Sequence, residues 1–576
     1  MSVAPARLFR LALAASLTVS ALLFFAWSWR WPLVGDSALI HYIVFLMQRG
    51  WAPYRQLIDQ QFPGSYLIEL AAMHIFGMGD LAWRCFDFSL LIAASLACFA
   101  VTRPATPPGA PSQGAPLKTA SPSWVGSPAA ESGTEARWLP GLFAACLFIL
   151  IHGRDGLAEG GQRDLTMAVL LLAATAFLFA AVRRSAARRN GLWASALFGL
   201  LSGIALTIKP TVLPLTFAQL ALACFVLSRR AHPWIAHAVS AALAYLVAPA
   251  LAVLFLAREH AFSAFYAGFH GIVPYYASLA HRPLSYVVLH SVSPVLPLVL
   301  IWFALLAVNS RSRPQPHDWE RTALAVGALF GLFDCILQAR ALPYYRYPLL
   351  AFLLPLMALD FTRALRTPRA PFTTAAGVPG ERSLLAGVEA SWVGSKRLSS
   401  ALAVIALSFG GFFLAPQSAV LIHRYRWWET DFISSLQQNL NALGGPALSG
   451  HIQCIDSISG CETALYRMRL EQSTGLLADY PLFGPDSVPI VRQTRQRVYQ
   501  DLLANPPRVI VVSSWLHFDG PGNYLKLDRW PALEDFLATR YTLQTEWTPF
   551  RTNKWWGREE TPASYRIYVL RPTPGP

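Results

Sequence analysis

Asp36 is the residue whose type and position most strongly suggest chemistry. It follows the first apolar segment of the chain, in the sequence Val34-Gly35-Asp36-Ser37. A carboxylate at the outer end of a membrane helix is costly unless it faces water or a polar cavity, so such an acid is a functional candidate by default. The alternative is that Asp36 only caps a helix running from Ser37.

A second acid, Asp164, stands where the polar segment 153–164 meets the next apolar run. It could orient a substrate, hold a divalent cation or stabilise positive charge, but its position equally suits a helix cap. Asp155, Glu159 and Gln162 lie in the same segment. They are weaker candidates to line a site, because a glycine-rich loop often carries polar residues only for solvation.

Bases beside the apolar runs could bind an anion such as a phosphate group. They are Arg55, Arg163, Lys209 and Arg346. An arginine would give a bidentate fork and a lysine a point charge. Lys209 could equally extend to lipid headgroups, and Arg346 could be an interfacial anchor between tyrosines. Further candidates to contact a substrate, with simple packing as the alternative, are Tyr54, Tyr345 and His270.

The composition determines what kind of element must position these residues. The chain has 576 residues, of which 54% are hydrophobic and 14% charged, and its mean hydropathy is +0.39. Such a chain is predicted to be a polytopic α-helical membrane protein. Its formal charge of +15 comes largely from short basic clusters between apolar runs, such as Arg183-Arg184 and Arg229-Arg230. Clusters of this kind mark the cytoplasmic side, so the charge indicates topology and not nucleic-acid binding.

Hydrophobic runs of about 17–25 residues mark the membrane spans. Eleven spans are predicted, at 9–29, 84–102, 138–152, 165–182, 192–208, 211–228, 234–256, 286–308, 322–338, 343–361 and 400–421. The first is expected to be an uncleaved span with the N-terminus in the cytoplasm. Two shorter apolar stretches, 37–49 and 64–78, are predicted to be helices at the outer interface.

The chain is predicted to divide into a transmembrane domain, 1–422, and an external soluble domain, 423–576. The first external loop is expected over 30–83. Residues 103–136 and 364–398 are rich in Pro, Gly and Ser, which cannot bury enough apolar surface to offset chain entropy. They are predicted to be cytoplasmic linkers without a site.

The segment after residue 422 has a different pattern. Short apolar runs such as 508–512 and 565–570 indicate strands, and helical periodicity appears between them. A soluble α/β domain with its own core follows from this pattern. Cys454 and Cys461 lie in it, and an external compartment would allow them to pair; two buried free thiols are the alternative.

With this topology, the candidate acids and bases fall on one side of the membrane. The order of three motifs on that side then resembles the GT-C superfamily of integral membrane glycosyltransferases, which includes lipid A aminoarabinose transferases and protein O-mannosyltransferases. The motifs are the segment from Asp36 to Pro53-Tyr54-Arg55 and Gln61-Phe62-Pro63, the acid of Gln162-Arg163-Asp164, and Ile208-Lys209-Pro210-Thr211. The resemblance covers roughly residues 9–350.

This resemblance implies a polyprenyl-phosphate-linked sugar as donor, Asp36 as catalytic base and Asp164 as a second acid. Glycosyl transfer from phosphate needs a base for the acceptor hydroxyl and cations for the leaving phosphate. Some members carry an acidic-basic pair where this chain has Gln61-Phe62, so contacts to the phosphate would come from Arg55, Arg163, Lys209 or Arg346. A divalent cation could take part, held by Asp36 and Asp164.

The acceptor implied is an envelope glycolipid, polysaccharide or protein, and the location is the inner cell membrane with the C-terminal domain in the periplasm. The alternatives are a secondary transporter, a lipid-linked sugar flippase and a non-catalytic envelope glycan assembly protein. A transporter would keep its polar residues near the bilayer midplane, where Asp87 and Asp334 are the main acids. The sequence has no nucleotide-binding glycine motif.

Overall fold

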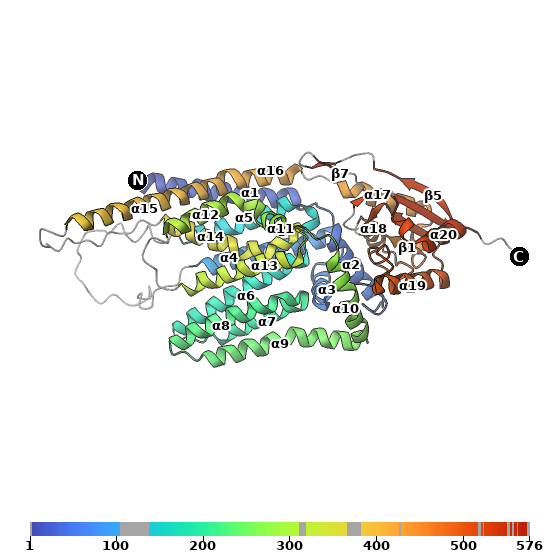
Figure 1. Ribbon diagram of the computed structural model, residues 1–576, viewed down its shortest axis with the longest axis horizontal. Coiled ribbons are helices and arrows are strands. Elements are labelled where there is room, and N and C mark those ends of the chain that lie inside the picture. The colour runs from blue at the N-terminus through green and yellow to red at the C-terminus, as the bar shows by residue number, and fades with distance from the viewer. Residues whose placement is uncertain are drawn as a thin grey trace.

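Long helices form an elongated bundle, and a smaller domain with a sheet stands at one end of it (Figure 1). The structure is a computed structural model. It describes residues 3–572 except 104–136, 188, 310–317, 366–381, 425–427, 458, 517–519, 522–523, 550–552, 556–557 and 561–562. The predicted fold class, a helical membrane protein with a C-terminal α/β domain, is confirmed.

Each of the eleven predicted spans coincides with a helical stretch. The stretches are α1 (Val3–Ser28), α4 (Asp80–Thr102), α5 (Leu139–Asp155), α6 (Arg163–Ala186), α7 (Leu192–Ile208), α8 (Leu213–Arg229), α9 (Trp234–Arg258), α11 (Leu284–Val292) with α12 (Leu296–Asn309), α13 (Trp319–Gln338), α14 (Tyr347–Ala364), and α15 (Arg382–Ser408) with α16 (Ala415–Arg424). Among the described residues, eight helices are long and apolar enough to cross a membrane, and α7 is a shorter apolar helix. The count of eleven crossings therefore stays a prediction.

Close helix packing depends on small residues at the contacts. Gly199 and Gly203 lie one turn apart on α7, and a Cβ at either position would collide with the backbone of α9 at Ala241 or Tyr245. Two small residues spaced in this way let helix backbones approach closely, which is a common device in membranes. Helices α7 and α9 are therefore held in close contact.

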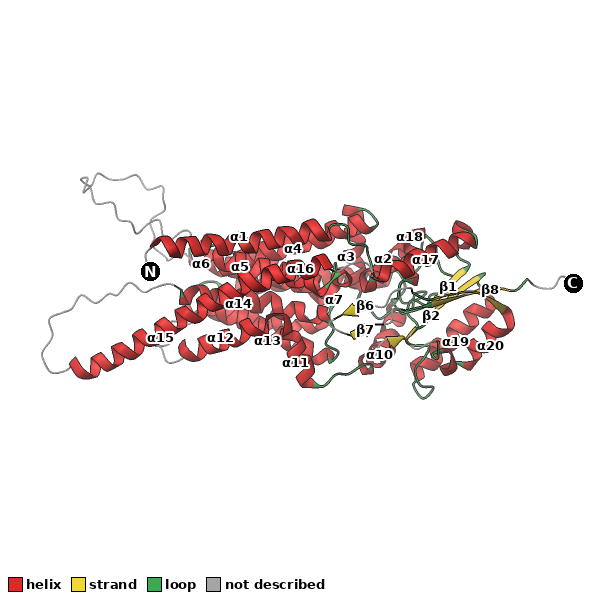
Figure 2. Ribbon diagram, turned by 90° about the horizontal axis from the view of Figure 1, so that it is seen from above, coloured by secondary structure: helices red, strands yellow, loops and turns green. Residues whose placement is uncertain are grey.

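Three further helices lie between the bundle and the C-terminal domain (Figures 1 and 2). They are α2 (Gly35–Gln48), α3 (Pro63–Phe76) and α10 (Phe262–Ser278). The helices expected over 37–49 and 64–78 are thus present. Pro63 occupies the first turn of α3, where its missing N–H costs nothing.

The C-terminal domain is a mixed sheet covered by helices. Its elements include α17 (Trp428–Ala442), β1 (Ile452–Ile455), α18 (Cys461–Met468), α19 (Pro489–Ala504), β2 (Val509–Ser513), α20 (Pro531–Arg540), β5 (Tyr541–Trp547) and β8 (Tyr565–Leu570). The strand order is β1-β2-β8-β5; β1 and β2 are parallel, and β8 is antiparallel to both of its neighbours. Short pairs are formed by β3 (Trp515–Leu516) with β4 (Gly520–Pro521) and by β6 (Asn553–Trp555) with β7 (Arg558–Glu560). Cys454 and Cys461 are joined by a disulfide between β1 and the start of α18.

The segment between α2 and α3 is attached to the C-terminal domain by contacts to its backbone. The Ile58 N–H donates to the Gly475 carbonyl at 2.8 Å, and a Cβ at Gly475 would collide with the backbone of Gln56. Arg497 Nη2 donates to the carbonyls of Arg55 and Gln56 at 2.9 and 2.8 Å. Residues 55–58 are therefore held against the C-terminal domain.

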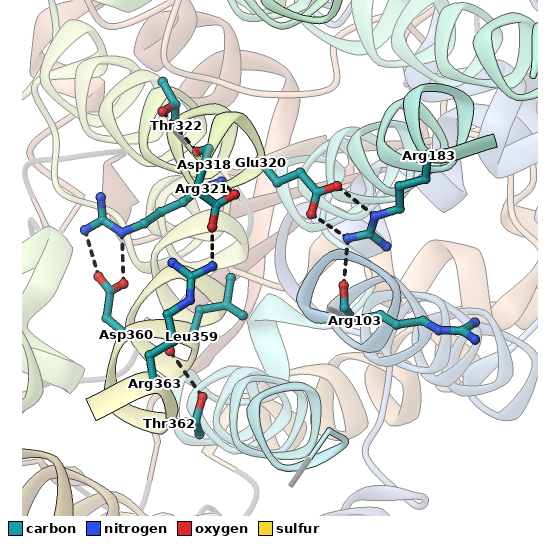
Figure 3. A network of polar contacts seen from close by, with 10 residues as sticks. All are labelled: Arg103, Arg183, Asp318, Glu320, Arg321, Thr322, Leu359, Asp360, Thr362 and Arg363. Carbon is teal, nitrogen blue, oxygen red and sulfur yellow. Dashed lines mark hydrogen bonds and ion pairs between the residues drawn. The ribbon is translucent and has the colours of Figure 1, made fainter. Parts of the chain in front are cut away.

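Ion pairs join α6, α13 and α14 at the opposite end of the bundle (Figure 3). Arg183 Nη2 lies 2.6 Å from Glu320 Oε2, and Arg321 Nη2 lies 2.8 Å from Asp360 Oδ2. This is the end at which the basic cluster around Arg183 was predicted to face the cytoplasm.

The structure corrects one predicted linker. Helix α15 begins at Arg382, inside the segment 364–398 that was expected to lack regular structure. Helix formation there extends a membrane-length helix backwards, and hydropathy alone does not detect such a polar extension. Most of the other predicted linker, 103–136, lies outside the described residues.

Candidate active site

Acids and bases from separate loops converge at the end of the bundle that faces the C-terminal domain. Helix α2 begins at Gly35, which has a φ of +64° and packs against Ala158 in the short turn η2 (Leu157–Glu159). Ser37 Oγ donates to the Gly160 carbonyl at 2.7 Å. The two loops that carry Asp36 and Glu159 are thereby held side by side.

Asp36 lies in the first turn of α2 and is half-buried. Its side chain does not cap the helix, since the N-cap residue is Val34 and no side chain caps it. Within the described residues, Asp36 makes no hydrogen bond or ion pair, yet its charge acts on Glu159 and Arg163. A carboxylate in this position is available to accept a proton from a ligand.

Lys209 joins two buried acids from different helices. It follows the end of α7, and its Nζ lies 2.7 Å from Asp164 Oδ1 and 3.2 Å from Asp334 Oδ2. Burial by itself lowers the pKa of Lys209, but the two carboxylates outweigh burial and the pKa is raised. Lys209 therefore stays charged and turns into the protein, which contradicts the alternative that it extends to lipid headgroups.

Arg346 is also buried, with 4% of its side chain exposed. It lies in the turn η5 (Pro343–Arg346) before α14. Its Nη1 is 3.6 Å from Asp155 Oδ1, and its Nη2 is 2.8 Å from His290 Nε2. The interpretation of Arg346 as an interfacial anchor is therefore wrong. Tyr345, which precedes it, is buried and faces Lys209 with its ring.

Arg163 makes fewer and longer polar contacts than Lys209 and Arg346. Its nearest charged partner is Asp164, with Nε 3.6 Å from Oδ2, and its side chain is 16% exposed. No hydrogen bond from its guanidinium is found among the described residues. Arg163 thus has five N–H donors available at the centre of the acid cluster.

Several buried acceptor atoms near these cations have no hydrogen-bond partner among the residues that the structure describes. They are Asp155 Oδ2, Glu159 Oε2, Gln162 Oε1 and Asp164 Oδ2. Burial raises the pKa of Glu159 well above its ordinary value, and the carboxylates of Asp155 and Asp36 raise it further. Buried polar atoms normally have partners, so this group of open acceptors is suited to a ligand with several hydroxyl groups.

No group of three or more His, Cys, Asp or Glu side chains in the described part of the chain is arranged to hold a metal ion. Asp36 and Asp164 were the pair expected to hold a divalent cation if one takes part. Arg163 and Lys209 lie beside Asp164, and a divalent cation at this site stays a prediction.

Three predicted site residues lie apart from the cluster. Arg55 and His270 are exposed, and the His270 ring packs on Tyr266 at 4.2 Å on α10. Tyr54 is buried, and its hydroxyl donates to the Gln61 carbonyl at 2.6 Å. Among the described residues, no hydrogen bond or ion pair links these three side chains to Asp36.

Asp334 belongs to the site although the sequence placed it inside a span. It lies one turn before the end of α13, where Thr211 Oγ1 and Gln338 Nε2 each donate to its carboxylate at 2.9 Å. Its distance from the helix end was the available signal. The structure thus places Asp334 near the end of its helix and not at the middle of the span.

The comparisons with known proteins agree with this architecture. No protein-family model matches the chain, and no match is found among curated proteins. The structure is similar to that of ArnT from Cupriavidus metallidurans in the apo state, with 15% identity, a TM-score of 0.54, and coverage of 96% of this chain and 97% of ArnT. ArnT bound to undecaprenyl phosphate matches with 14% identity, a TM-score of 0.50 and coverage of 98% of both chains.

An oligosaccharyltransferase from Archaeoglobus fulgidus matches with 12% identity and a TM-score of 0.46, covering 94% of this chain and 74% of that chain; the fold comparison rests on the two ArnT structures. The chain therefore has the overall fold of the ArnT structures, in agreement with the resemblance suggested by its motifs. At these identities, the similarity establishes the fold and not the reaction.

Proposed function

We propose that the protein is a membrane glycosyltransferase that moves a sugar from a polyprenyl-phosphate donor to an envelope acceptor at the external face. The observation that carries this proposal is the position of Asp36, which makes no hydrogen bond or ion pair with any described residue. Its charge acts on Arg163, in a cluster that also holds Lys209 and Arg346. The ArnT-like fold supports it, as does the undecaprenyl phosphate bound to one of the ArnT structures.

The reaction assigns Asp36 and the cations to opposite sides of the sugar. Asp36 takes the proton from the acceptor hydroxyl while that oxygen forms a bond to the anomeric carbon. The bond from this carbon to the phosphate oxygen breaks, and the polyprenyl phosphate leaves with the electron pair. The extra negative charge on the phosphate is stabilised by positioned cations.

Arg163 is the best candidate for first contact with the phosphate. Lys209 and Arg346 already have close partners, so a phosphate would have to compete with them. Arg163 is not bound in this way and can present two parallel N–H groups to the phosphate oxygens. Asp164 then has one oxygen on Lys209 and the other open for a donor or acceptor hydroxyl.

The test is transfer of radiolabelled sugar from synthetic polyprenyl-phosphate sugars to an envelope lipid extract by purified protein in detergent. Asp36→Asn should abolish transfer without changing thermal stability, and Arg163→Gln should raise the donor KM. The matched control is Glu320→Gln, which removes an acid at the opposite end of the bundle (Figure 3). Transfer by Asp36→Asn at the wild-type rate would contradict the role of the base.

A transporter or flippase would give no transfer by folded wild-type protein with any donor. Substitution of Asp334 does not separate the two functions, because Asp334 shares Lys209 with Asp164. Product formation is therefore the measurement that decides between them.

A further inference from the structure

A buried ionic cluster lies directly behind the candidate active site. Asp87 on α4 is fully buried, and its Oδ2 lies 2.7 Å from Arg84 Nη1. Its Oδ1 lies 3.3 Å from His152 Nε2 on α5. The other His152 nitrogen, Nδ1, lies 2.8 Å from the Tyr347 hydroxyl on α14. Arg84 Nη2 also donates to Ser28 Oγ at 2.9 Å, so the cluster joins four helices.

Stability alone is a poor reason for such a cluster. The desolvation of buried charges offsets much of their attraction, and apolar replacements of similar volume are often as stable. Ionisable residues inside membrane proteins are rare and usually functional. The question is therefore what this cluster holds in place.

Asp87 is also bonded to the loop that carries Glu159 and Asp155. The Gly161 N–H donates to Asp87 Oδ1 at 2.6 Å, and the Gly160 carbonyl accepts from Ser37 Oγ on the other side. Gly161 has a φ of +62°, and a Cβ there would lie 2.6 Å from Trp83 Nε1. The Gly160–Gly161 peptide is thus fixed between α2 and α4.

This turn separates two of the acids that have an open oxygen, Glu159 and Asp164. Glu159 immediately precedes it, and Asp164 follows it in the first turn of α6. A second link leads through His152 to Tyr347, which follows Arg346 directly in the chain. Asp155, the ionic partner of Arg346, is one turn after His152 on α5. The buried cluster is therefore linked to Glu159 and Asp164 through the turn. It is linked to Arg346 and Asp155 through His152.

We propose that Asp87, held by Arg84 and His152, is a positioning residue that fixes the Gly160–Gly161 turn and through it Glu159 and Asp164. The role as a positioning residue for catalysis rests on the proposed function, because that function assigns the two acids to the active site. The inference that Asp87 fixes the turn does not depend on the proposed function. Asp87 acts through the Gly161 N–H and makes no contact with substrate.

The direct test is hydrogen–deuterium exchange of full-length protein in detergent, read for peptides that cover residues 156–164. Asp87→Asn exchanges a charged acceptor for a neutral one and should raise exchange at the Gly161 amide by about tenfold or more. In the transfer assay, kcat should fall by about tenfold or more while the donor KM stays within about twofold, because Arg163 is retained.

The matched control is Asp360→Asn. Asp360 is also a buried acid bonded by an arginine, and it accepts from Arg321 Nε and Nη2 at 2.9 and 2.8 Å at the opposite end of the bundle (Figure 3). This variant should change neither exchange at 156–164 nor kcat. Its thermal stability shows how much of the effect of Asp87→Asn comes from loss of a buried ion pair alone.

A second variant covers the case in which Asp87→Asn does not fold because Arg84 is left unpaired. Arg84→Met/Asp87→Asn removes both charges, avoids an isolated buried cation, and should loosen the turn to the same extent. Unchanged exchange at 156–164 in a folded variant would overturn the proposal. So would an equal rise of exchange along the whole chain, which would mean general destabilisation. If wild type transfers no sugar, the proposed function fails, and the exchange result still decides whether Asp87 fixes the turn.

Discussion

Replacement of Lys209 by methionine should destabilise the protein through one particular neighbour, Asp164. The two acids that Lys209 bridges are 1% and 0% exposed, and removal of one partner from a buried ion pair typically costs about 3–5 kcal/mol. The acids differ in what remains to them. Asp334 keeps the donors Thr211 and Gln338, each at 2.9 Å. Among the described residues, Asp164 keeps only Arg163, at 3.6 Å.

The two acids are therefore expected to differ in how much stability their neutralisation restores. Added to Lys209→Met, the substitution Asp164→Asn should restore most of the lost stability, and Asp334→Asn should restore much less. Thermal inactivation half-lives in one detergent measure the order without assuming reversible unfolding. Arg566→Met is the control, because it removes a surface ion pair with Glu546 that is worth about 0–1 kcal/mol. Equal rescue by the two acids would refute the reasoning.

Three further predictions concern other parts of the molecule. Gly475→Ala should lower thermal stability and transfer activity together, because the added Cβ collides with the backbone of Gln56; limited proteolysis between residues 50 and 62 should become faster. Glu159 has a pKa raised by burial from its ordinary 4.5, so stability present below pH 4.5 is lost as the pH rises through the raised value. Thermal scans across pH should show Glu159→Gln lacking this loss, and parallel curves would contradict it. Cys454→Ser/Cys461→Ser should destabilise the C-terminal domain by about 2–3 kcal/mol, the low end for a short disulfide loop, as measured by urea titration of domain fluorescence.

The helices of the bundle could be predicted because the membrane imposes a simple rule. Every backbone N–H and C=O in lipid must be bonded within the segment, so an apolar run of sufficient length becomes a helix. Each predicted span accordingly coincides with a helical stretch. The rule does not apply to polar residues, and for that reason the start of α15 at Arg382 was missed.

The sequence predicted several residues of the candidate site, but it did not predict which of their side chains contact one another. Asp36, Arg163, Asp164 and Lys209 were identified from their positions at the ends of apolar runs, and the structure brings them together. Arg55 and His270 were expected in loops on the same side of the membrane, and they lie on the surface. Position at the end of a run says which side of the membrane a residue occupies, and it does not say which way the side chain turns.

The sequence by itself determined that this is a membrane protein with a soluble C-terminal domain, and that its unusual acids and bases lie near helix ends. Those properties follow from hydrophobicity and chain order. Only the tertiary structure decided that Lys209 binds two acids, that Arg346 is buried, and that Asp87 reaches the Gly161 amide. Contacts of this kind join residues that are far apart in the chain, and they depend on how the helices rotate and pack against one another.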